Sequence, residues 1–170
     1  MGPLATVALA AMLSLVKTLL TIFVFLLASC TDSSTSTYAE QLDPLLYENT
    51  VLNDQLLNVA GGIYNDTVDS QRTAELFRSD VIPIAQHLAH QAAAVQAPEE
   101  WAASHAELVE IWAQRAHSYR ELSEALWLVD AERFSNAQVA LDKAAREEET
   151  WFADIRQKLA KQGVALNQFP

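Results

Sequence analysis

Three histidines in the middle of the chain are the residues that could bind a transition metal. His87 and His90 lie three positions apart, and reflection of one predicted helix on the next, through the turn near residue 97, places His105 opposite residue 89. Imidazole nitrogens are common ligands of zinc and copper, so three at one level could hold such an ion. The competing interpretation is a core His105 with two solvated neighbours, because His87 and His90 point about 60° apart on a helix.

Four charged residues form a second set that could do chemistry. Arg115 and Glu148 occupy positions where the surrounding pattern is apolar, and reflection through the turns brings Asp80 and Asp54 to the level of Arg115. A planar guanidinium can bond two carboxylates at once, so these residues predict one polar layer halfway along the helices. The layer could be a structural network that fixes helix register, or a site for a small ligand or cation.

Motifs for other chemistries are missing from the sequence. It has no Gly-rich phosphate loop, no serine elbow and no two-histidine protease motif. Its single cysteine, Cys30, excludes disulfides within the chain and zinc sites made of several thiolates. No nucleophile, base and orienting group can be assembled with plausible geometry. The sequence therefore predicts a protein that is not an enzyme and needs no cofactor.

Long amphipathic helices must position these side chains. Beyond Leu42, helix-forming residues dominate and β-branched runs are absent. Each predicted helix start carries a capping residue or a proline: Asp43-Pro44, Asp69-Ser70, Ala97-Pro98 and Asp130. Gly163 is predicted to end the last helix. Short turns make neighbouring helices antiparallel, so residues 43–170 are predicted to form an all-α, up-down-up-down four-helix bundle.

The apolar residues recur at a three-four spacing, which indicates left-handed packing of the helices. The predicted seams are Leu45, Asn49, Leu52, Leu56, Val59 and Ile63; Ala74, Phe77, Val81, Ile84, Leu88 and Val95; Trp101, His105, Leu108, Trp112, Arg115, Tyr119, Leu122, Leu126 and Val129; and Phe134, Ala137, Leu141, Ala145, Glu148, Phe152, Ile155 and Leu159. Pro83 interrupts the second seam and predicts a kink.

Trp127 lies just off the third seam and is the best candidate for a partner contact. The apolar tail 164–170 is expected to fold back over the bundle, with a docking peptide as the alternative.

The first thirty residues have the pattern of an export signal. Lys17 is followed by an uncharged apolar run from Thr18 to Ser29, which is too short for a membrane-spanning helix. The tetrad Leu27-Ala28-Ser29-Cys30 resembles the lipobox of bacterial lipoproteins. The resemblance implies that Cys30 is acylated, as by palmitate, and that signal peptidase II cleaves before it. Residues 1–29 are thus expected to be a signal peptide, with Met12 as the expected true start.

The same resemblance implies a location and an anchor. Lipidated Cys30 would hold the protein on a membrane of the cell envelope, and residues 30–42 are expected to be a flexible tether because 31–37 are small and polar. Thr31, rather than an aspartate, follows the cysteine. By the enterobacterial sorting pattern, this favours the periplasmic face of the outer membrane in a host with two membranes.

The mature chain is strongly acidic. The formal net charge is −11 over 170 residues, and Lys17 is the only charged residue of 1–29, which leaves −12. Such a surface repels nucleic acid and anionic headgroups, so proteins or cations are the expected partners. We expect a non-enzymatic, lipid-anchored envelope protein that acts as an accessory or assembly subunit through protein contacts. The alternative is a module that binds a small ligand or metal between its helices.

Overall fold

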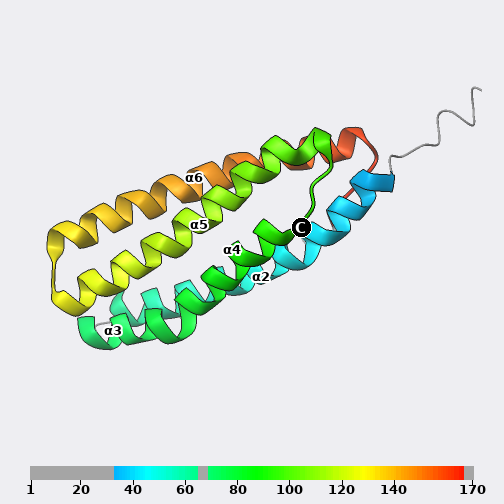
Figure 1. Cartoon of the computed structure of the whole chain (residues 1–170). Helices are drawn as coiled ribbons and strands as arrows, with labels where there is room; N and C mark the ends of the chain where they lie inside the picture. The colour runs from blue at the N-terminus through cyan, green and yellow to red at the C-terminus, as the bar shows by residue number, and fades with distance from the viewer. Residues whose placement is uncertain (1–32, 65–68, 167–170) are drawn as a thin grey trace, which may run out of the picture. The chain divides into compact units, whose positions relative to one another are not determined.

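The computed structural model describes residues 33–64 and 69–166, and these residues form helices joined by short turns (Figure 1). The elements are α2 (Ser33–Tyr64), α3 (Ser70–Leu76), the π-helical turn η1 (Phe77–Val81), α4 (Ile82–Ala94), α5 (Glu99–Leu128) and α6 (Ala131–Lys161). Because α3, η1 and α4 follow one another without a break, the described residues make four rods. They belong to one compact unit that begins at Ser34.

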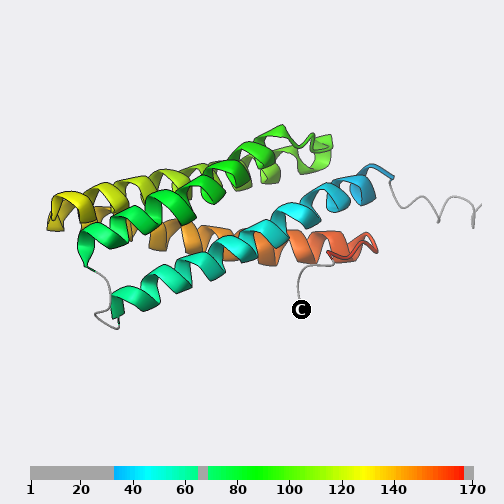
Figure 2. The ribbon, with the colours of Figure 1, turned by 90° about the horizontal axis from the view of Figure 1, so that it is seen from below.

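The four rods run alternately up and down, which confirms the predicted four-helix bundle (Figure 2). The start of α2, the start of α5 and the end of α6 meet at one end of the bundle. There Glu100 of α5 accepts hydrogen bonds from Thr35 of α2 and from Gln162, which follows α6. Towards the other end, Ser123 of α5 donates to the Ala74 carbonyl of α3. The turn between α5 and α6 lies at that second end, which we call the tip.

The helix ends follow the predicted capping residues. Asp69 and Asp130 each precede a helix and accept a hydrogen bond from a backbone N–H in its first turn. Gly163 follows α6 with φ +75°, and the N–H groups of Gly163 and Val164 bond to the carbonyls of Ala160 and Leu159. This pattern uses the carbonyls that a helix end leaves free, and glycine adopts its left-handed conformation without steric cost.

The predicted tether is wrong for the residues that the structure describes. Helix α2 already begins at Ser33 and continues through Asp43-Pro44, which was the predicted helix start. The reason is burial: Thr35, Tyr38 and Leu42 continue the three-four spacing of the seam and are at most 1% exposed. Pro44 is tolerated inside the helix because it lies on the exposed face, where water can satisfy the carbonyl that lacks its usual donor.

Most of the predicted seam residues are buried or half-buried, and two are wrong. Val129 ends α5 in a left-handed conformation and is 76% exposed. On α6, Ala144 is buried and Ala145 is exposed, so at this one turn the seam passes one residue earlier than predicted. The irregularity predicted at Pro83 takes the form of the π-helical turn η1, which precedes the proline. Proline has no N–H to donate, and helix kinks occur at prolines and at single π-helical turns such as this one.

The tail folds back as far as the structure describes it. Leu166 is 9% exposed and belongs to the hydrophobic core, and Val164 packs against that core. Residues 167–170 lie outside the described part of the chain, as do the predicted signal peptide 1–29, the start at Met12 and the lipidation site Cys30. Among the described residues, no helix combines the length and the apolar character that crossing a membrane requires.

Candidate functional site

A buried ion pair lies in the middle of the bundle, as predicted for Arg115 and Glu148. Nη1 of Arg115, on α5, lies 2.6 Å from Oε2 and 2.7 Å from Oε1 of Glu148, on α6. Only 5% of the arginine side chain and 9% of the glutamate side chain are exposed. Two charges removed from water in this way are tolerated only when they face each other and their remaining hydrogen-bonding groups also have partners.

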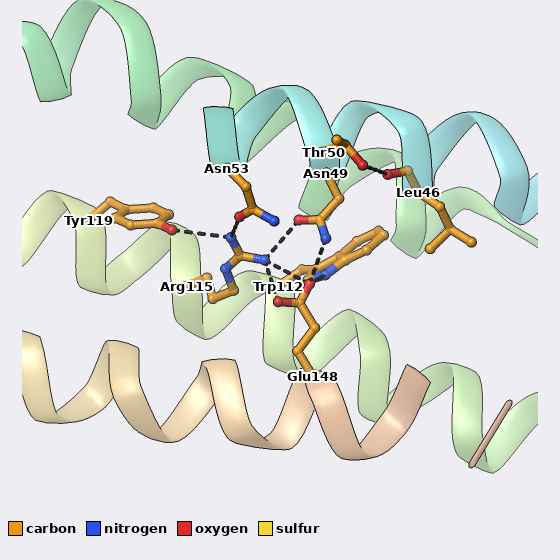
Figure 3. Close-up of polar contacts among 8 residues, drawn as sticks. All are labelled: Leu46, Asn49, Thr50, Asn53, Trp112, Arg115, Tyr119 and Glu148. Atoms are coloured by element: carbon orange, nitrogen blue, oxygen red, sulfur yellow. Dashed lines mark hydrogen bonds and ion pairs between the residues drawn. The ribbon is translucent and has the colours of Figure 1, made fainter. Parts of the chain in front are cut away.

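Helix α2 supplies two of those partners, as Figure 3 shows. Asn49 accepts from Nη1 of Arg115 at 2.8 Å and donates to Oε1 of Glu148 at 3.0 Å, so one amide bridges both charges. One helical turn later, Oδ1 of Asn53 accepts from Nη2 of Arg115 at 2.8 Å. The network therefore joins α2, α5 and α6.

Helix α5 contributes two aromatic partners from the turns on either side of the arginine. The indole N–H of Trp112 donates to Oε1 of Glu148 at 2.6 Å. Nη2 of Arg115 donates to the hydroxyl of Tyr119 at 3.2 Å (Figure 3). Burial by itself lowers the pKa of the Arg115 guanidinium, but Tyr119 and Glu148 outweigh it, so the pKa is raised and the arginine stays charged. We call Asn49, Asn53, Trp112, Arg115, Tyr119 and Glu148 the polar layer.

Two of the four residues predicted for this layer do not belong to it. Asp54 and Asn53 are both exposed on α2, and it is Asn53 that accepts a hydrogen bond from Arg115. Asp80 is half-buried within η1 and has no bond to Arg115. Reflection about a turn matches residues by height but not by direction around the helix, and the π-helical turn further rotates Asp80 away from its expected direction.

The prediction missed four members of the layer. Asn49, Asn53, Trp112 and Tyr119 were not assigned to it. A signal was present: Asn49 and Asn53 are four residues apart on α2, and Trp112 and Tyr119 flank Arg115 on its own seam. Residues three or four apart share a helix face, so polar groups at this spacing can meet one buried charge.

The three histidines do not come together, which corrects the candidate metal site. His87 and His90 are exposed on α4, and Nε2 of His87 lies 3.8 Å from Oε1 of Glu48. His105 is buried: its Nε2 lies 2.9 Å from the Ala92 carbonyl and its Nδ1 lies 3.1 Å from the Tyr38 hydroxyl. Because a carbonyl only accepts, Nε2 carries a proton, and in the neutral imidazole Nδ1 then accepts from tyrosine. Within residues 33–64 and 69–166, no group of three potential ligands could hold a metal ion.

A shallow groove of about 480 Å³ runs between α2 and α6 above the polar layer. Asn49, Asn53 and Glu148 line it, together with Thr50 and Phe152 among others. Two of the polar side chains that line this groove are already engaged: Glu148 accepts from three side chains, and both ends of the Asn49 amide are bonded. The charged groups of the layer are thus bonded to one another.

No family model, curated protein or solved structure matches this chain.

Proposed function

We propose that this chain is a lipid-anchored, non-enzymatic helical-bundle protein of the bacterial cell envelope that acts as an accessory or assembly subunit through protein contacts. The polar layer supports protein contact over ligand binding between the helices, because its charged groups already bond to one another. The observation that carries the proposal is an apolar surface at the tip. Trp127, Leu128 and Val129 follow one another at the end of α5 and are 39%, 62% and 76% exposed. We call these three residues the tip patch.

A helix cap and ion pairs between α5 and α6 hold the backbone around the tip patch. Asp130 caps α6 directly after the patch, and Arg133 of α6 pairs with both Glu121 and Glu124 of α5. The guanidinium of Arg78 lies 4.7 Å from the ring centre of Trp127 and covers one of its faces. Contiguous exposed apolar residues on such a base are typical of protein contact sites.

Val129 gives the second argument for a contact at the tip. The α5 and α6 helices end in the same pattern of backbone hydrogen bonds, with Gly163 after α6 and Val129 after α5. Valine has φ 56° and ψ 40°, a left-handed conformation that strongly disfavours a β-branched residue. A strained and exposed valine at a position suited to glycine is consistent with selection for contact rather than for stability.

Replacing Val129 with glycine should separate the stability of the bundle from its contact with a partner. We expect Val129→Gly to raise the free energy of unfolding by about 1 kcal/mol, because the strain of roughly 1–2 kcal/mol is relieved and only part is lost to the freer unfolded chain. The amount of partner protein recovered with the lipoprotein after crosslinking in membranes should fall at the same time. Urea titration measures the stability, and mass spectrometry measures the recovered partner. A variant that is more stable and binds fully would remove Val129 from the contact.

The early start of α2 supports a further part of the proposal. Only Thr31 and Asp32 separate Cys30 from Ser33, where the helix begins, and such a short segment reaches about 10 Å at most. Lipidation at Cys30 would therefore hold the start of α2 close to the bilayer. The 30 residues of α5 span about 45 Å, so the tip patch would meet its partner at a fixed height above the membrane.

Lengthening this connection tests the fixed height. Eight Gly/Ser residues inserted between Asp32 and Ser33 add about 15 Å of flexible chain. We expect the free energy of unfolding to stay within about 0.5 kcal/mol, because the insertion precedes the helix. Recovery of the membrane partner should fall several-fold. The same eight residues added after Pro170 provide the control. If the two variants recover the membrane partner equally well, the tip patch does not act at a fixed height, although it could still contact the partner.

The main test is mild crosslinking of the intact lipoprotein in its native membranes, followed by purification and mass spectrometry. We expect one stoichiometric envelope partner, and we expect Trp127→Ser with Leu128→Ser to lose it. Tyr47→Ser with Val139→Ser is the matched control, because it also removes two exposed large apolar residues but away from the tip. If the wild-type protein recovers no reproducible partner, the accessory-subunit proposal fails.

A further inference from the structure

The outer surface between α5 and α6 holds a hollow with a volume of about 810 Å³. These two helices pack side by side along their length (Figure 1). Ile111, Ala140 and Trp151 line the hollow together with residues that point outward from both helices: Glu107, Glu110, Gln114, Lys143, Arg146, Glu147, Thr150 and Asp154. We call this hollow the α5–α6 groove.

Apolar side chains form the floor of the groove. Ile111 and Trp151 are buried, and Ala140 is half-buried between the charged residues of the rim. The polar atom of Trp151 does not face a ligand, because its indole N–H donates to the Ser104 carbonyl at 2.6 Å. Ile111 and Trp151 are only 8% and 4% exposed, so the floor offers an occupant a small apolar surface, in which the indole N–H of Trp151 is already bonded.

The two walls differ in charge. On the α5 side, Glu107 and Glu110 have no ion pair among the described residues. On the α6 side, Lys143 lies 3.6 Å from Glu147, and Asp154 pairs with Lys158 at 2.5 Å. Arg146 also lines this wall and has no ion pair among the described residues, so the two cations and two carboxylates that line the α6 wall balance in number. The α5 wall thus presents two uncompensated carboxylates one helical turn apart, on a chain whose charge is already −11.

The backbone excludes one common form of peptide recognition. Every wall residue of the groove belongs to a regular helix, where N–H and C=O groups bond within the helix. An extended peptide could not add itself as a strand, so recognition must use side chains. The groove extends from Ala140 to Asp154 along α6, about 20 Å, which corresponds to a helix of about 14 residues.

We propose that the α5–α6 groove binds a basic amphipathic helix of a partner protein. The apolar face of that helix would pack on Ile111, Ala140 and Trp151, and a row of Lys or Arg would face Glu107 and Glu110. Such charge pairs at an exposed rim select the partner and speed its approach more than they add affinity. The inference rests on the proposed function, in which the bundle works through protein contacts, and it adds a second contact surface with a stated chemistry.

A designed peptide tests the groove without knowledge of the natural partner. The probe is a 14-residue Leu/Lys helix with one apolar and one basic face, carrying a dye and a photo-reactive group. The full-length chain is held in phosphatidylcholine nanodiscs, with empty nanodiscs as the blank. We expect binding by fluorescence anisotropy, and crosslinks that map to residues 107–114 and 140–154. A Leu/Glu twin peptide should bind at least tenfold more weakly.

Charge reversal on the α5 wall provides the decisive comparison. Glu107→Lys with Glu110→Lys should weaken peptide binding at least tenfold. Glu40→Lys with Asp54→Lys makes the same change of charge at exposed positions of α2 and should weaken it less than threefold. Circular dichroism checks that all variants remain helical. Equal losses in both variants, crosslinks at the tip patch, complete displacement by spermine or no measurable binding by the wild type would each overturn the inference.

Crosslinking in native membranes then separates this inference from the proposed function. If the wild-type protein recovers a partner and the Glu107→Lys, Glu110→Lys variant recovers it equally well, the groove is not the contact and the accessory-subunit function stands. If neither protein recovers a partner, the proposed function fails. Recovery by the wild type with loss in the groove variant supports both.

Discussion

Replacing Glu148 with leucine should lower the free energy of unfolding by about 3–5 kcal/mol, the range for removal of one partner from a buried pair. The guanidinium of Arg115 would keep its charge in a site where only 5% of its side chain is exposed. The Trp112 indole and the Asn49 amide would lose the same carboxylate oxygen. Small domains are stable by only about 5–15 kcal/mol, so urea denaturation should show a large fall in the midpoint.

The double variant distinguishes a stranded charge from a lost packing contact. Arg115→Met with Glu148→Leu removes both charges and restores apolar volume, so we expect it to be more stable than Glu148→Leu alone, although it makes fewer hydrogen bonds. An unchanged m-value would show that unfolding exposes the same surface. If Glu148→Leu costs less than about 1 kcal/mol, the pair is not the central constraint of the fold.

The same double variant also tests whether the polar layer fixes helix register. Because Asn49 and Asn53 on α2 bond to charges on α5 and α6, only one relative position of the three helices satisfies all of them. A bundle with an apolar layer in its place could slide by a turn at little cost. We therefore expect the double variant to remain helical while the indole resonance of Trp112 broadens.

The parts of the fold that the sequence predicted well depend on local chemistry. Asp69 and Asp130 cap helices through bonds to residues three positions later, and Gly163 ends α6 because of its own backbone freedom. Arg115 and Glu148 could be paired because each interrupts an otherwise apolar seam, and a buried charge needs a partner. Such signals can be read without knowledge of how distant helices turn toward one another.

The failures share a different cause, which is direction around the helix axis. Height alone placed Asp54 and Asp80 beside Arg115 and brought the three histidines together, but neighbouring residues on a helix point 100° apart. The predicted tether failed for a related reason. Its small polar composition suggested a flexible chain, whereas Thr35 is buried and hydrogen-bonds to Glu100 across the bundle. Tertiary contacts therefore decided the structure of that segment against its composition.

Replacing Tyr38 with alanine should lower the free energy of unfolding by about 3–5 kcal/mol, as for other large aromatic residues in a core. Tyr38 lies in the segment predicted as a tether and is 1% exposed. Its ring stacks on Trp101 at 6.0 Å between ring centres and meets the edge of His105 at 5.6 Å. Gln41→Ala, three residues further along on the exposed face, should change stability by less than about 0.5 kcal/mol. A flexible segment would give two small effects.

Tyr38→Phe isolates the hydroxyl from the ring. We expect a loss of about 1–2 kcal/mol at neutral pH, because Nδ1 of buried His105 loses its donor while the aromatic packing remains. Burial raises the pKa of the Tyr38 hydroxyl above its ordinary value of about 10. The unfolded chain then releases this proton more readily than the folded protein, so the wild type should lose stability as the pH rises above 10. The phenylalanine variant should lose less over the same range in urea titrations. Parallel losses would show that another group is responsible for the alkaline instability.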